Sequence, residues 1–211
     1  MNRQQPKIPN QLDIQSFDEL LYEEDSILEL CEINGEDVSN TFFERARLYQ
    51  VSVKNCKFIH TDFSRVDLTD VIFENCDFSN ANLENASIFR VEFKNCKLLG
   101  CKFPESYLGH VQFDHSIVKL TAFADSKLEK VSFHQSDLSQ ADFYNCQFKT
   151  VEFQTCHLNG ANFEETSLKG IDLSTSQFDT LMVSTRLLKG CKVSQDQAII
   201  FATLLGLVIN E

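Results

Sequence analysis

The sequence predicts an all-β fold: a parallel solenoid of square coils, closed at its C-terminal end by a helix. Three observations support this: an apolar residue recurs at every fifth position over most of the chain, a longer pattern repeats every twenty residues, and both stop before a short apolar segment near the C-terminus. The chain has 211 residues, of which 43% are hydrophobic, with seven glycines and three prolines. This composition excludes collagen-like chains and disordered chains rich in proline and glycine.

The five-residue repeat runs from Ile33 to Val193. All 33 positions at this spacing are apolar, which chance would produce with a probability on the order of 10⁻¹². A second register, two residues earlier, holds mostly small or β-branched side chains such as Cys56, Val71 and Ala86. Residues five apart do not all lie on one face of an α-helix, nor on one face of a straight strand. The chain must therefore turn a corner once per five residues, so that both registers point towards one axis.

The twenty-residue repeat sets the number of corners in each coil. Four units of five make one repeat, so the coil has a square cross-section. At the strand spacing of ~4.8 Å, about eight coils form a rod on the order of 40 Å long. The side chains that recur at this spacing are Val51, Val71, Val91, Val111, Val131, Val151 and Ile171 and, two places later, Phe73, Phe93, Phe113, Phe133 and Phe153.

Several five-residue units resemble the A(D/N)LxX motif of the pentapeptide-repeat family. They include Ala81-Asn82-Leu83-Glu84-Asn85, Ala141-Asp142-Phe143-Tyr144-Asn145 and Ala161-Asn162-Phe163-Glu164-Glu165. The resemblance covers roughly residues 31 to 193. It implies the fold of that family, a right-handed quadrilateral parallel β-helix. We therefore expect three regions: an N-terminal cap segment over residues 1–30, the pentapeptide-repeat β-helix over 31–193, and a C-terminal helix and dimerisation cap over 194–211.

The N-terminal segment breaks the repeat, because Asp13, Asp18 and Glu23 occupy the positions that would face the core. A short helix is predicted from Ser16 to Tyr22, with Ser16 as its N-cap and Glu19 completing a capping box. An extended hairpin over the first coil is the alternative. Either structure would protect an otherwise open edge of the solenoid.

The C-terminal segment has the signals of a helix that is apolar on nearly all sides. Ser194 is a good N-cap, Gln197 completes a capping box, and Gly206 stops the helix. One side of this helix can close the last coil, and the other side needs a partner, which at a rod end suggests a second copy. A cap folded wholly onto its own rod is the alternative. The expected tail-to-tail homodimer uses Ile199, Ile200, Phe201, Leu204, Leu205 and Leu207.

The cysteines and histidines predict no catalytic, cofactor-binding or metal-binding site. All eight cysteines fall in the small inward register, where a thiol acts as a small hydrophobe. The five histidines lie at outward positions, and His115 and His134 share a face in adjacent coils with Asp114 nearby. A catalytic or metal role would need a third converging group in a pocket, and a convex rod offers little concavity. A concave cluster of carboxylates would instead favour an enzyme built on the β-helix.

Charge is segregated around the predicted rod. The net charge of −12 argues against direct binding to nucleic acid. One face, centred on the column from Phe63 to Phe163, carries seven acidic residues against Arg65 and Lys102, and the neighbouring face is net basic. A stiff rod about as wide as a duplex, with regularly spaced carboxylates, presents a DNA-like field to a protein with a basic groove. The predicted partner-binding residues are Asp62, Glu84, Glu105, Asp125, Asp142, Glu164 and Glu165.

The rod length, the acidity and the closing segment from Ser194 to Ile209 resemble the Qnr-type and MfpA-like branch of the family. This resemblance implies a homodimer without catalysis or cofactors that acts on DNA gyrase and topoisomerase IV as a DNA mimic, protecting these enzymes from quinolones or inhibiting supercoiling. The better-known Qnr proteins extrude loops from their coils, whereas here the repeat never loses phase, so no such loop is expected. An interaction scaffold for another protein is the alternative function.

The sequence also predicts a cytoplasmic protein with no membrane partner. The first eleven residues are polar and include Pro6 and Pro9, without the apolar stretch of a signal peptide. The longest apolar run, Ala198 to Leu205, is far shorter than the roughly 20 residues that span a bilayer.

Overall fold

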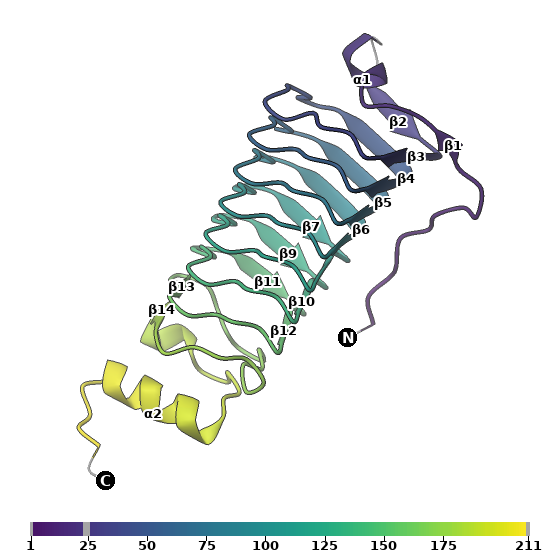
Figure 1. The fold of residues 1–211 in the computed structure, drawn as a ribbon. Coiled ribbons are helices and arrows are strands. Elements are labelled where there is room, and N and C mark those ends of the chain that lie inside the picture. Colours follow the sequence, from purple (N-terminus) through teal and green to yellow (C-terminus); the bar gives the residue numbers. More distant parts are fainter. Residues whose placement is uncertain (1, 23–25, 210–211) are drawn as a thin grey trace.

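The computed structural model describes residues 2–22 and 26–209, and it confirms the predicted parallel β-solenoid. The coils stack into a rod, with the short helix α1 (Glu19–Tyr22) at one end and α2 (Gln195–Leu204) at the other (Figure 1). Residues 1, 23–25 and 210–211 of the two expected end segments lie outside the described residues, and with them the predicted core position of Glu23. No helix of the described chain is long and apolar enough to cross a membrane.

Short parallel strands form the sides of the coils. A 3₁₀ turn, η1 (Thr185–Leu187), precedes the final helix. The strands are β1 (Asp13–Ile14), β2 (Ile27–Glu29), β3 (Cys31–Asn34), β4 (Arg47–Lys54), β5 (Asp67–Glu74), β6 (Ser87–Lys94), β7 (Tyr107–Gly109), β8 (Gln112–Asp114), β9 (Lys127–Glu129), β10 (Ser132–His134), β11 (Gln147–Lys149), β12 (Glu152–Gln154), β13 (Ala161–Phe163) and β14 (Leu181–Val183).

The register between coils follows the twenty-residue repeat. Leu48 of β4 aligns with Leu68 of β5, and Phe133 of β10 with Phe153 of β12. The same offset of twenty holds from the pairing of β2 with β4 to the bridge between Asp172 and Lys192. No residue is therefore extruded as a loop over this part of the described chain, as the unbroken repeat predicted.

The five-residue register forms the core. All 33 of its side chains are buried except Val38, Phe148, Val183, Leu188 and Val193, which are partly exposed. Phenylalanines stack along the rod in nearly parallel pairs: the ring centroids of Phe93 and Phe113 are 4.9 Å apart at an interplanar angle of 3°, and those of Phe123 and Phe143 are 4.9 Å apart at 1°. Edge-to-face contacts link neighbouring columns, as between Phe113 and Phe123. This packing ties each coil to the next and makes the rod stiff.

The small inward register adds hydrogen bonds between coils. The hydroxyl of Ser126 donates to the carbonyl oxygen of Phe103, 2.7 Å away, and the thiol of Cys146 donates to that of Phe123 at 3.0 Å. Seven of the eight free cysteines are buried, and Cys191 is partly exposed. Burial raises the pKa of the Cys146 thiol to about 12. A buried, protonated thiol is unreactive, which supports the structural interpretation of these cysteines.

The N-terminal helix is shorter than predicted. It begins at Glu19 rather than directly after Ser16, because Phe17 turns into the open end of the core, where it is fully buried against Phe58. The Phe17 amide donates to the carboxylate of Glu36 at 3.0 Å, which fastens this residue to the first coil. Strand β1 pairs in parallel with β3, so the alternative of a hairpin over the first coil is wrong.

The residues before β1 form an extended arm, defined here as residues 2–12, that runs back along the side of the rod (Figure 1). The Lys7 amide donates to Asp70 at 2.9 Å, and the Gln4 amide donates to Nδ1 of His110 at 2.8 Å. The Arg3 guanidinium forms an ion pair with Glu92 at 2.6 Å. Neither repeat of the sequence predicts this arm.

The predicted capping box of the C-terminal helix is confirmed. The Gln197 amide donates to the Ser194 hydroxyl at 3.2 Å, and the Ser194 amide donates to Oε1 of Gln197 at 2.9 Å. The Gln197 side chain also donates from Nε2 to the carbonyl oxygens of Leu173 and Ser176. One side chain therefore both caps the helix and fastens it to the last coil.

Candidate protein-binding surfaces

The first candidate surface is the acidic face, defined by the seven carboxylates predicted for partner binding. They occupy three adjacent outward columns. Asp62 and Asp142 lie in the bridges that pair successive coils. Glu84 and Glu164 lie in the turns that follow, and the remaining three lie at left-handed corner positions, with φ angles of 53° for Glu105, 60° for Asp125 and 56° for Glu165.

Backbone and side-chain hydrogen bonds together fix Asp62 and Asp142. Oδ1 of Asp142 accepts from the Tyr144 amide at 3.0 Å and from the Asn162 side chain at 2.9 Å. Oδ1 of Asp62 accepts from the Ser64 amide at 2.9 Å and from the Asn82 side chain at 3.2 Å. These two aspartates hold the turns in place. The remaining four without an ion pair, Glu84, Glu105, Asp125 and Glu164, are all exposed. Of these, Asp125 accepts from the Asn145 side chain at 2.7 Å and Glu84 from the Asn85 side chain at 3.3 Å.

The acidic face differs from the other faces in how its charges are paired. On the other faces several carboxylates form close ion pairs, such as Arg90 with Asp70 at 2.6 Å and Lys149 with Glu129 at 2.7 Å. Others there, such as Glu74 and Asp179, form none with the described residues, so unpaired carboxylates are concentrated on the acidic face without being confined to it. On the acidic face, Glu165 pairs with Arg186, a contact that the sequence analysis missed. The other six carboxylates form no ion pair with any residue of 2–22 and 26–209. They are Asp62, Glu84, Glu105, Asp125, Asp142 and Glu164.

The second candidate surface is the apolar end of the rod. The structure places Ile200 and Phe201 against the core, with the Phe201 ring 5.7 Å from that of Phe178. The other four predicted dimerisation residues are exposed, and so are Val208 and Ile209, which were not predicted. Between α2 and the last coil lies a groove of about 280 Å³, lined by apolar side chains that include Leu188, Phe201 and Leu205. The exposed predicted residues are Ile199, Leu204, Leu205 and Leu207.

Two family models match the coils. One, described as pentapeptide repeats in eight copies, matches residues 46–85, and the other, a pentapeptide repeat region, matches residues 86–163. The chain belongs to the pentapeptide-repeat family. A comparison with curated protein sequences finds no match.

Solved structures of other pentapeptide-repeat proteins resemble this one. Full-length QnrB1, a plasmid-mediated fluoroquinolone resistance protein, is 21% identical, with 83% of this chain and 90% of that chain covered and a TM-score of 0.40. A trypsin-treated variant of QnrB1 is 19% identical, with 85% and 100% covered and a TM-score of 0.49. HetL, involved in heterocyst differentiation regulation in the cyanobacterium Nostoc sp. strain PCC 7120, is 15% identical, with 86% and 95% covered and a TM-score of 0.35. At these identities the similarity extends to the fold and no further.

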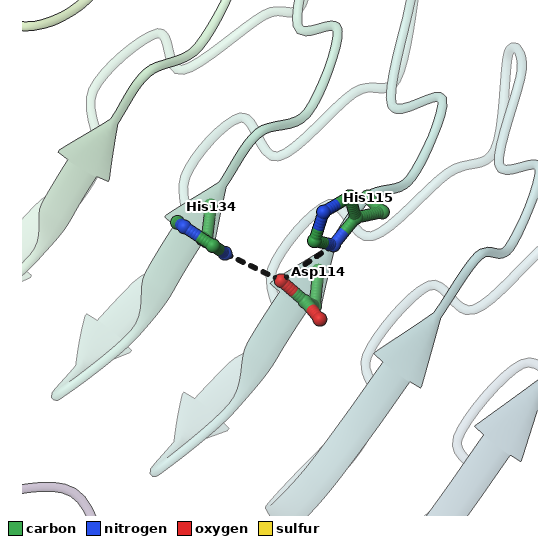
Figure 2. A group of neighbouring side chains, drawn as sticks. All are labelled: Asp114, His115 and His134. Atoms are coloured by element: carbon green, nitrogen blue, oxygen red, sulfur yellow. Dashed lines mark hydrogen bonds and ion pairs between the residues drawn. The ribbon is translucent and has the colours of Figure 1, made fainter.

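The pentapeptide-repeat rod also brings together the two histidines that the sequence analysis placed on one face. His115 and His134 approach each other through Asp114 (Figure 2). Nδ1 of His134 lies 2.6 Å from Oδ1 of Asp114, and Nδ1 of His115 lies 3.0 Å from the same oxygen. Burial raises the pKa of Asp114, but the hydrogen bonds from His134 and His115 outweigh it and lower the pKa below its usual value. Asp114, which the sequence placed near the two histidines, is therefore a third converging group, and all three side chains lie on an open surface instead of in a pocket.

Proposed function

We propose that this pentapeptide-repeat protein is a non-catalytic DNA mimic that binds DNA gyrase or topoisomerase IV and modulates its activity, including its response to quinolones. It acts in the cytoplasm, as a homodimer, without a cofactor. The observation that carries the proposal is the acidic face, where six carboxylates have no ion-pair partner among the described residues. The alternative is an interaction scaffold for a different protein, which enzyme assays and pull-downs distinguish from a DNA mimic.

The charge density of this face suits a protein that normally holds DNA. Glu84, Glu105, Asp125, Asp142 and Glu164 lie on successive coils, and at ~4.8 Å per coil their charges extend over about 20 Å. One strand of DNA carries a charge every ~3.4 Å, so the linear densities agree within a factor of about two. The stiff core fixes the backbone positions that carry these carboxylates, so the ordering entropy lost on binding is limited to their side chains. A basic DNA-binding groove would therefore attract the rod electrostatically.

The apolar C-terminal end supports the dimeric part of the proposal. Six exposed apolar side chains follow one another on α2 and the residues after it, and Val208 is 87% exposed. A contiguous apolar surface of this kind marks a site of association. Joining two rods through this end gives one rod of about twice the length, with an acidic face on each half.

A charge-reversal experiment tests the proposed partner. The purified protein, at micromolar concentration, is added to gyrase and to topoisomerase IV in supercoiling, decatenation and quinolone-induced cleavage assays. We expect a change in at least one of these reactions that weakens as salt increases. Combined Lys substitutions at Glu84, Glu105, Asp125 and Glu164 should raise the protein concentration needed for this effect by about tenfold or more, because they invert the local field.

The matched control reverses four acidic residues on the other faces and in the N-terminal segment, namely Asp18, Glu29, Glu74 and Asp179. It changes the net charge of the protein by the same amount, so it should retain the effect if the acidic face is the contact. An equal loss of the effect on the two enzymes in both variants would mean that only the overall charge of the protein matters. No effect of the unmodified protein on either enzyme, together with capture of an unrelated protein in pull-downs, would favour the scaffold function instead.

A further inference from the structure

Asp114, His115 and His134 form a group of three side chains whose ligand atoms all lie within 4.8 Å of one another. Among the described residues, no other group of three or more His, Cys, Asp or Glu side chains converges in this way. Figure 2 shows both imidazole rings directed at the same carboxylate oxygen. The rings are nearly perpendicular, at 87°, with their centroids 5.4 Å apart.

The backbone holds these side chains in position. Asp114 ends β8 and His134 ends β10, and the two residues are aligned partners in adjacent coils. His115 follows at a corner with a φ of 49°, and its amide donates to the carbonyl oxygen of His134 at 3.0 Å. All three side chains are therefore carried by one hydrogen-bonded pair of coils. Rigid placement of this kind is what a preorganised ligand site requires.

Neighbouring cations do not neutralise the carboxylate. Lys94 aligns with Asp114 in the preceding coil, but its ammonium group pairs with Glu92 at 2.7 Å. On the other side, the residue aligned with His134 is Gln154, which carries no charge. The only ion-pair partners of Asp114 among the described residues are the two histidines.

We propose that Asp114, His115 and His134 bind a divalent transition-metal ion, with Zn²⁺ as the best-fitting one. Two imidazole nitrogens and one carboxylate oxygen are ligands that Zn²⁺ accepts, whereas Mg²⁺ and Ca²⁺ prefer oxygen alone. The ion binds through Nδ1 of each histidine, so each ring carries its proton on Nε2. The remaining coordination position faces solvent.

The distances suit this ion after a small movement. In a tetrahedral site with metal–ligand bonds of about 2.0–2.1 Å, ligand atoms lie about 3.3 Å apart. The two Nδ1–Oδ1 distances, 2.6 Å and 3.0 Å, need to open by less than 1 Å. The ligand atoms of the two histidines lie within 4.8 Å of each other, so they need to approach by at most about 1.5 Å. Both histidines and Asp114 are partly exposed, with 51%, 37% and 27% of the side-chain surface accessible for His115, His134 and Asp114. Their side chains therefore have room for the rotation, and the ion has direct access from solvent.

The test uses the full-length chain, purified without a histidine tag and stripped of metal. Zn²⁺ is titrated in competition with a chromophoric chelator, and we expect saturation at one Zn²⁺ per chain. Removing a ligand with His134→Ala or His115→Ala should weaken binding by more than the roughly 10–100-fold that loss of an outer-shell partner costs. Nitrogen NMR of the histidine rings should show that Zn²⁺ shifts Nδ1 of both residues.

The control variant is His60→Ala. His60 is an exposed corner histidine with a φ of 57°, close to that of His115, but it does not belong to the converging group. It should leave Zn²⁺ binding unchanged, and thermal unfolding without metal shows whether each variant is folded. Binding that survives in folded His115→Ala and His134→Ala, as it would at cysteines, or no saturable binding by the unmodified protein, would overturn the proposal.

Discussion

The two ends of the rod present contrasting surfaces. At the N-terminal end, Phe17 and Leu20 cover the first coils and are 0% and 5% exposed. At the C-terminal end, α2 covers the last coil with one side only, and Leu205 and Val208 remain 65% and 87% exposed. Both ends must satisfy the open edge of a parallel sheet. The N-terminal end places its cap residues in the core, whereas the C-terminal end concentrates exposed apolar side chains in one short segment.

This difference indicates which end is available for self-association. The N-terminal end also has exposed apolar side chains, but its four are spread over residues 14–42, whereas the six at the C-terminal end lie within residues 199–209. The arm over residues 2–12 adds polar contacts along the rod. The C-terminal end combines exposed aliphatic side chains with a groove between α2 and the coil. A dimer of this protein is therefore expected to join two C-terminal ends, with the N-terminal ends far apart.

The largest expected effect is the loss of this dimer. Leu205→Asp combined with Leu207→Asp places two charges in the proposed interface. A dimer that persists at micromolar concentration has an association free energy of about 8 kcal/mol, and the two buried charges oppose it. Light scattering should give twice the chain mass for the unmodified protein and the single mass for the variant. The control Leu120→Asp, at a side chain 51% exposed on the rod, should remain dimeric. If light scattering gives the single chain mass for the unmodified protein, the C-terminal end does not form a dimer and the prediction is wrong.

The second effect tests the N-terminal cap. Phe17→Ala should lower the free energy of unfolding by about 3–5 kcal/mol, because it leaves a cavity at the end of the phenylalanine stack. Phe42→Ala is the matched control, since the Phe42 side chain is 76% exposed and should contribute little. Urea unfolding of both variants measures the difference. Similar unfolding midpoints in the two variants would mean that Phe17 does not seal the core.

The third effect concerns the attachment of α2. Gln197→Ala removes the donor to two buried carbonyl oxygens, of Leu173 and Ser176, as well as half of the capping box. Leaving buried acceptors unpaired costs about 1–3 kcal/mol each, whereas Ser194→Ala loses only a cap worth about 1 kcal/mol. Thermal unfolding should therefore rank Gln197→Ala as the more destabilised. The reverse order would show that α2 is held by its apolar side alone.

The sequence predicts the core and the C-terminal cap well, and it predicts the N-terminal end poorly, for physical reasons. A side chain at every fifth position must face the axis whatever its neighbours are, so periodicity alone places Phe73 or Phe133. The capping box at Ser194 depends on residues three apart, which are visible in any sequence. The arm depends on pairs such as Arg3 and Glu92, 89 residues apart, and nothing in a polar segment shows which coil it will meet.

The acidic face illustrates the same limit. Its composition follows from the twenty-residue repeat, because a fixed period assigns every outward residue to a face. The repeat does not show which of these carboxylates form ion pairs, because the partner can be a side chain that the last coil brings close. Arg186 reaches Glu165 from a 3₁₀ turn that interrupts the strand pattern, so sequence alone placed both residues but missed their contact.

The smallest expected effect is a pH dependence of the arm. Nδ1 of His110 accepts the Gln4 amide proton, so this hydrogen bond exists only when the imidazole is neutral. Burial, together with the positive charge of Lys130, lowers the pKa of His110. Its ordinary value is about 6.5, and the undocked state therefore takes up a proton first. The contribution of His110 to docking is complete above about pH 6.5 and is lost as the pH falls below it.

The contacts of the arm with Asp70 and Glu92 should persist over that range. Burial raises the pKa of Asp70 and Glu92, but hydrogen bonds from Arg90 and the Lys7 amide to Asp70, and from Lys94 and Arg3 to Glu92, outweigh it and lower both values. Both carboxylates therefore stay ionised well below pH 6. Hydrogen exchange should show the Gln4 amide losing protection as the pH falls below about 6.5, by an amount equivalent to the ~1 kcal/mol of one hydrogen bond, while the Lys7 amide stays protected. His110→Gln keeps an acceptor without a titratable group, so its Gln4 protection should not depend on pH; equal dependence in both proteins would mean that the arm responds to a different group.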